Sequence, residues 1–136
     1  MGGMTERRIR GVLASLVVFD LVLVVWAGAF PELWFRVFHG IDYDDPEGFL
    51  RRCAANWAAF LLFQIIALVR WRRDVVWLAV IAGVRLSDIF TDVTYVLVAR
   101  DTTWFAKAAL APSSLGNLIV GIYLLRAYRA RNPSRA

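Results

Sequence analysis

The chain has 136 residues, of which 60% are hydrophobic and 20% charged, and its formal net charge is +5. Its apolar residues are gathered into four long blocks, which excludes an ordinary soluble domain and indicates a polytopic helical membrane protein. The positive charge does not indicate a nucleic-acid partner, because the arginines cluster beside the apolar blocks, as topology determinants do. The single cysteine, Cys53, excludes an intrachain disulfide.

Residues 1–10 form a short basic arm, and residues 11–30 are predicted as the first membrane span, with Asp20 near its midpoint. An alternative is that residues 1–29 are a cleaved secretory signal, because a basic start, an apolar run and a small-residue Ala27-Gly28-Ala29 site follow that pattern. The central Asp20 and the length of the apolar run favour a span that is retained.

The connection over residues 31–48 begins with Pro31–Phe38, in which aromatic residues alternate with charges. This pattern predicts a short helix lying in the membrane interface. An acidic, turn-like loop over residues 41–47 follows, and we interpret it as a loop on the translocated side. His39 is the chain's one histidine, so a typical metal site is not predicted.

Residues 49–69 are predicted as the second span, with Arg52 and Asn56 on one helical face. Ala55 and Ala59 have the spacing that lets another helix approach closely. Residues 75–99 are predicted as the third span and residues 104–125 as the fourth, with Lys107 in its first turn. In the fourth span Ser113, Asn117 and Gly121 form a small, weakly polar packing stripe, and residues 126–136 are predicted as a basic tail.

The third span contains the most informative pattern, because Arg85, Asp88, Asp92 and Tyr95 fall within roughly an 80° arc of the helix. A charge at the centre of a membrane helix costs roughly 2.5–3.5 kcal/mol on insertion scales, so these groups need partners or water. Asp20 lies at the same depth as Arg85, and we expect these two residues to form a buried ion pair.

The distribution of basic residues predicts the topology. The arm, the turn after the second span and the tail hold ten of the 16 basic residues, whereas the other connections are mostly acidic. The positive-inside rule therefore places both termini in the cytoplasm, with the four spans antiparallel in a cell membrane, the bacterial cytoplasmic membrane if the chain is prokaryotic.

Depth counting also predicts how the remaining charges meet. Arg52 and Lys107 lie one turn above the level of Asp92, with side chains long enough to reach down to it. Three cations, with Arg85, would then neutralise Asp20, Asp88 and Asp92, as a membrane interior favours. The predicted result is an outward-opening polar pocket lined by Arg52, Asn56, Asp88, Asp92, Tyr95 and Lys107.

Ionisable residues inside a membrane indicate a functional site more often than a clamp, since apolar packing holds helices together more simply. The four-helix architecture is similar to that of DoxX-like small membrane proteins, a resemblance of architecture without a shared motif. The main hypothesis is a protein that binds a lipid, quinone or other amphiphile, or an accessory subunit of a membrane complex, with no cofactor.

Three other classes of function remain open from the sequence. An oligomeric proton-coupled transporter is one, because Asp20 in the first span resembles the layout of small multidrug-resistance transporters. Pairing of Asp20 with Arg85 argues against it, since a carboxylate in an ion pair shuttles protons poorly. A scaffold in a larger complex is the second. An enzyme is disfavoured, because no Ser-His-Asp arrangement, metal cluster or phosphate-binding glycine motif is present.

Overall fold

The computed structural model describes the backbone of residues 2–132 and the side chains of residues 6–132. Within these residues the protein is all-α, with no sheet, and its five helices are α1 (Gly2–Ala29), α2 (Pro31–Phe38), α3 (Phe49–Arg70), α4 (Val76–Val98) and α5 (Trp104–Arg131). Three stretches are long and apolar enough to cross a membrane: Glu6–Ala29, Phe49–Arg70 and Trp104–Arg131. The fold is therefore that of a small multi-helix protein with candidate transmembrane helices.

The helices agree with the predicted spans except at the two ends of the chain. Residues 2–10, predicted as a basic arm, form the first turns of α1, which begins at Gly2. Residues 126–131 are likewise the end of α5. In both extensions beyond the predicted spans, an apolar side chain is buried in the core: Ile9 in α1 and Ala127 in α5. Met1 and residues 133–136 of the predicted tail lie outside the described residues.

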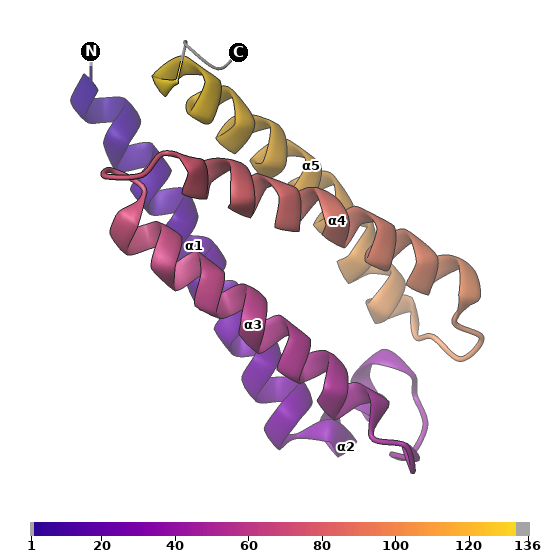
Figure 1. Ribbon diagram of the computed structural model, residues 1–136. Helices are drawn as coiled ribbons and strands as arrows, with labels where there is room; N and C mark the ends of the chain where they lie inside the picture. Colours follow the sequence, from indigo (N-terminus) through magenta and orange to yellow (C-terminus); the bar gives the residue numbers. More distant parts are fainter. Residues whose placement is uncertain (1, 133–136) are drawn as a thin grey trace.

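The four long helices are arranged as two pairs rather than as an even bundle. α1 packs along α3 and α4 packs along α5, whereas contact between the pairs is sparse. Figure 1 shows both termini at one end of the molecule, from which the two pairs diverge toward the end where α2 lies. We refer to these as the terminal end and the α2 end.

The terminal end contains the main apolar core, in which all four long helices meet. Trp71, which follows α3, is its largest member and is 2% exposed. Gly121 of α5 lies against Leu86 of α4, and a Cβ there would come within 2.8 Å of two Leu86 side-chain carbons. The predicted small-residue contact at Gly121 is thus made with α4. The buried core residues are Ile9, Leu13, Ala67, Trp71, Leu78, Ile81, Ala82, Leu124 and Ala127.

The packing face of α3 differs from the predicted one. Ala55 and Ala59 are exposed, so they do not mediate helix packing within the chain. α3 instead turns Ala54, Leu61, Gln64 and Ala67 inward. On a helix Ala54 and Ala55 point 100° apart. The inward-facing alanine is therefore the neighbour of the predicted one, and a different face of α3 is buried.

At the α2 end, α2 connects the two helix pairs. Trp34 of α2 packs edge-to-face on Trp26 of α1 and contacts Trp57 of α3. On the other side, the Thr103 backbone N–H donates to the Phe38 carbonyl at 2.9 Å, and its hydroxyl donates to the Val37 carbonyl at 2.7 Å. α2 was predicted as an interfacial helix, and its helical form is confirmed.

Candidate functional site

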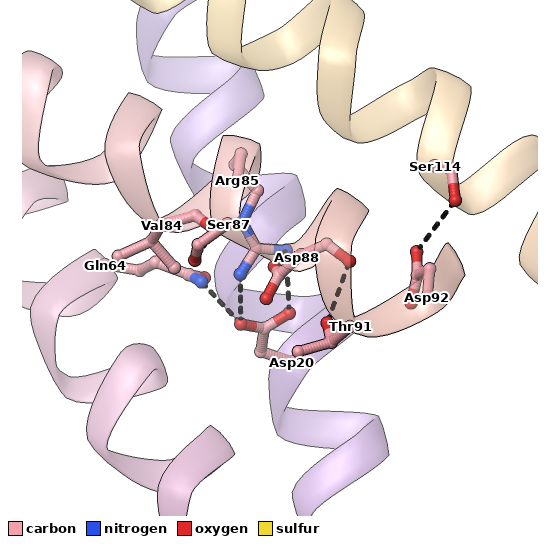
Figure 2. A network of polar contacts seen from close by, with 9 residues as sticks. All are labelled: Asp20, Gln64, Val84, Arg85, Ser87, Asp88, Thr91, Asp92 and Ser114. Atoms are coloured by element: carbon pink, nitrogen blue, oxygen red, sulfur yellow. Dashed lines mark hydrogen bonds and ion pairs between the residues drawn. The ribbon is translucent and has the colours of Figure 1, made fainter. Parts of the chain in front are cut away.

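Four polar side chains meet between the helix pairs, and we call them the Arg85 cluster: Asp20 of α1, Gln64 of α3, and Arg85 and Asp88 of α4 (Figure 2). Arg85 Nη2 lies 2.7 Å from Asp20 Oδ2, and Nη1 lies 3.3 Å from Oδ1, so the contact is bidentate. Gln64 Nε2 donates to Asp20 Oδ2. Arg85 Nη1 also lies 3.4 Å from Asp88 Oδ2, one turn further along α4.

The centre of this cluster is sealed from solvent. Asp20 is 4% exposed, Gln64 0% and Arg85 3%. Nevertheless, Gln64 Oε1 and Arg85 Nε have no hydrogen-bond partner among the described residues. A buried polar atom without a partner costs roughly 1–3 kcal/mol. The cluster is therefore an expensive way to hold helices together, compared with apolar packing.

Asp92 lies apart from this cluster, on the side of the α2 end. Its carboxylate accepts a hydrogen bond from the Ser114 hydroxyl of α5 at 3.4 Å (Figure 2). Ser113 and Asn117 of α5, two residues of the predicted packing stripe, are half-buried. The group that contacts Asp92 is thus a neutral hydroxyl rather than a cation.

Tyr95 and His39 join α4 to the segment after α2. His39 Nδ1 lies 2.8 Å from the Asp101 carbonyl oxygen, and the Tyr95 hydroxyl lies 3.0 Å from His39 Nε2. Because a carbonyl only accepts, Nδ1 donates, and in the neutral ring Nε2 accepts from the tyrosine. We call this pair the His39–Tyr95 contact. Together with Thr103, it ties α2 to the loop between α4 and α5.

The structure does not bring Arg52, Asn56 and Lys107 into a pocket with Asp92. All three side chains are exposed, and neither Arg52 nor Lys107 forms an ion pair with any described residue. For Arg52 and Asn56 the physical reason is helical phase: each lies two residues from Ala54, the inward-facing residue in this part of α3, and so points about 160° away from it. The expected balance of three cations against three carboxylates is therefore replaced by one guanidinium, Arg85, among Asp20, Asp88 and Asp92.

Three polar partners received no role in the sequence reasoning. Gln64 was identifiable, because it is a polar residue deep in a predicted span, opposite Asp20. The Ser114 hydroxyl oxygen lies 3.3 Å from the Leu110 carbonyl oxygen and 3.4 Å from Asp92 Oδ2. His39 was considered only as a metal ligand, since nothing in the sequence indicates that residues 39 and 95 meet.

A shallow, open depression of about 480 Å³ lies on α4 near the α2 end. Tyr95 contributes to its lining, so the depression and the His39–Tyr95 contact are adjacent. The full lining is Phe90, Thr91, Thr94, Tyr95, Val98 and Ala99, and its surface is predominantly apolar.

No family model, curated protein or solved structure matches this chain. The resemblance to DoxX-like proteins therefore rests on architecture alone and assigns no role to any residue.

Proposed function

We propose that this chain is a four-span integral membrane protein, with both termini in the cytoplasm, that binds an amphiphile beside α4 in the outer half of the membrane. The observation that carries the proposal is the charge balance around α4. Three carboxylates, Asp20, Asp88 and Asp92, face inward, and among the described residues Arg85 is the one cation that forms an ion pair with any of them. Such an excess of negative charge is costly inside a membrane unless a cation or a proton neutralises it.

We include α4 as the fourth span, because its length and the direction of its polar side chains are typical of a membrane-spanning helix. Its 23 residues correspond to about 34 Å of helix, enough to cross the hydrocarbon region. The charges of Arg85 and Asp88 are turned toward α1 and α3, and Asp92 is turned toward α5. Polar residues in membranes usually face such interior positions.

The class of ligand follows from the same groups. Of the lipids, quinones and other amphiphiles that the sequence leaves open, the excess carboxylate favours one with a positively charged head beside Asp92. The depression lined by Phe90, Thr94 and Val98 offers its apolar part a surface along α4. Asp92 is half-buried and faces hydroxyl groups rather than a guanidinium, so its charge remains available to a ligand.

Native mass spectrometry of gently purified protein tests this proposal. We expect a co-purifying amphiphile that is released by Asp92→Asn. Glu47→Gln is the matched control, because Glu47 is an exposed carboxylate at the α2 end, and it should leave the ligand in place. A ligand retained in full by Asp92→Asn would contradict the proposal, and a co-purifying protein in its place would favour an accessory subunit.

A second candidate function, proton-coupled transport, is favoured by one observation. No cation among the described residues forms an ion pair with Asp92, so this carboxylate is free to exchange protons, whereas Asp20 is held by Arg85 and Gln64. Proteoliposomes distinguish the two functions. Substrate flux driven by a pH gradient, abolished by Asp92→Asn and without a retained ligand, would favour the transporter.

The topology is tested separately. A reporter fused after Ala136 should be cytoplasmic, because of the arginines at the terminal end. Cys53 is exposed in the first turns of α3, and it should react with a membrane-impermeant thiol reagent added from outside. Labelling of Cys53 only in inverted vesicles would reverse the assigned orientation.

A further inference from the structure

The terminal end carries a dense cluster of positive charge drawn from three separate stretches of the chain. Residues 6–10, 70–74 and 126–131 contain nine arginines against two acidic residues, Glu6 and Asp74. Figure 1 shows that the beginning of α1, the loop between α3 and α4, and the last turns of α5 lie at this same end. The arginines are Arg7, Arg8, Arg10, Arg70, Arg72, Arg73, Arg126, Arg129 and Arg131.

Two of these arginines, Arg72 and Arg131, are held in place. The Arg72 guanidinium lies 5.7 Å from the centroid of the Trp71 ring, and the Arg131 guanidinium lies 5.2 Å from it. Trp71 itself is 2% exposed, because the apolar core encloses it. A buried indole thus orients one guanidinium from the α3–α4 loop and one from the end of α5. Because these cation–π contacts already hold the two side chains in place, less side-chain entropy is lost when they bind a ligand.

Glu6 of α1 lies between the same two arginines. Its carboxylate is 3.1 Å from Arg72 Nη2 and 3.9 Å from Arg131 Nη2. One carboxylate neutralises two guanidiniums only in part. The Arg72 side chain is also 59% exposed and that of Arg131 26% exposed, so both remain accessible.

We infer that Arg72 and Arg131 form a binding site for the phosphate of an anionic lipid headgroup, at the membrane surface of the terminal end. Guanidinium groups bind phosphate through paired, charge-assisted hydrogen bonds. Trp71 directly follows α3, at the end of a span, where side chains lie at headgroup level. The seven surrounding arginines raise the local concentration of anionic lipid. This inference goes beyond the proposed function and is independent of the ligand beside Asp92.

In this arrangement Glu6 competes with the phosphate for the two guanidiniums. Removing its charge should therefore strengthen lipid binding, although it removes an ion pair from the protein. A site that was merely structural would respond in the opposite direction, because loss of Glu6 would loosen Arg72 and Arg131. Glu6→Gln thus distinguishes a lipid site from a structural contact.

The experiment is native mass spectrometry of the full chain equilibrated with mixed micelles of phosphatidylglycerol and phosphatidylcholine. We expect preferential retention of phosphatidylglycerol, reduced roughly 30-fold in the double variant Arg72→Gln/Arg131→Gln, at about 1 kcal/mol for each surface arginine. Glu6→Gln should increase retention. The matched control is Arg36→Gln/Arg51→Gln, which removes two exposed arginines at the α2 end and should leave retention unchanged.

Several results would overturn the inference. Retention without preference for the anionic lipid would do so, as would equal losses in the two double variants or reduced retention in Glu6→Gln. A further arm adds inorganic phosphate at the concentration of the lipid. Displacement of the lipid by phosphate alone would assign the site to free phosphate rather than to a lipid headgroup.

Discussion

Two polar regions lie along α4, and they differ in the partners that the other helices supply. In the Arg85 cluster, α1 and α3 bring a carboxylate and an amide to one guanidinium, and the centre is almost fully buried. Around Asp92 and Tyr95, α5 and the segment after α2 bring hydroxyl and imidazole groups, and the side chains are half-buried. The first region resembles a structural clamp, whereas the second is suited to binding a ligand.

The difference follows from the divergence of the helix pairs. About midway along α4 the pairs are still close enough for charges on α1 and α4 to meet directly, and the contact is buried. Toward the α2 end they are tied by α2 rather than by their own side chains (Figure 1). Low dielectric makes the first set of contacts strong and any loss there costly. The following four substitutions test this contrast, in order of decreasing expected effect on stability.

Asp20→Asn should have the largest effect. It leaves Arg85 buried with only the longer contact to Asp88, and breaking a buried pair costs about 3 kcal/mol or more. Equilibrium unfolding in mixed micelles measures the loss. Adding Arg85→Gln should recover part of it, because the unpaired charge is then removed. A double variant whose loss equals the sum of the single losses would show that the two residues are not coupled.

Gly121→Ala should destabilise the protein by about 1–3 kcal/mol, because the new methyl group overlaps the Leu86 side chain of α4. Gly116→Ala is the control on the same helix, since a Cβ there meets nothing within 4 Å. It should be neutral or slightly stabilising, as alanine favours a helix over glycine. Similar losses at both positions would mean that the tight packing is not confined to the terminal end.

Tyr95→Phe should cost about 1 kcal/mol, the usual net value of one hydrogen bond, because His39 Nε2 loses its partner. Proteolysis of the loop over residues 40–48 provides a local measurement, which should be faster in the variant if this contact holds α2 in place. Unchanged proteolysis would indicate that the Thr103 hydrogen bonds hold α2 by themselves.

Asp92→Asn should change stability least, by less than about 0.5 kcal/mol, because an amide oxygen can still accept from Ser114 and no cation is left unpaired. The same unfolding measurement applies. A loss as large as that of Asp20→Asn would contradict the distinction between the two regions and would place Asp92 within the structural clamp.

The sequence was sufficient for the features that depend on composition and local order. Apolar blocks of about 20 residues predict the long helices, because only a helix satisfies its backbone groups in an apolar environment. The position of Asp20 in the first block and of Arg85 in the third was enough to expect an ion pair, and the structure places these side chains 2.7 Å apart.

Tertiary structure decided which face each helix turns inward and how the pairs diverge. Arg52, Asn56 and Lys107 have suitable depths for a pocket with Asp92, but depth along a helix says nothing of rotation about its axis. A rotation of 100° separates Ala54, which is buried, from Ala55, which is exposed. The meeting of His39 with Tyr95 likewise depends on the path of a loop. These features depend on packing between segments that are far apart in the sequence, and the order of residues along the chain does not show that packing.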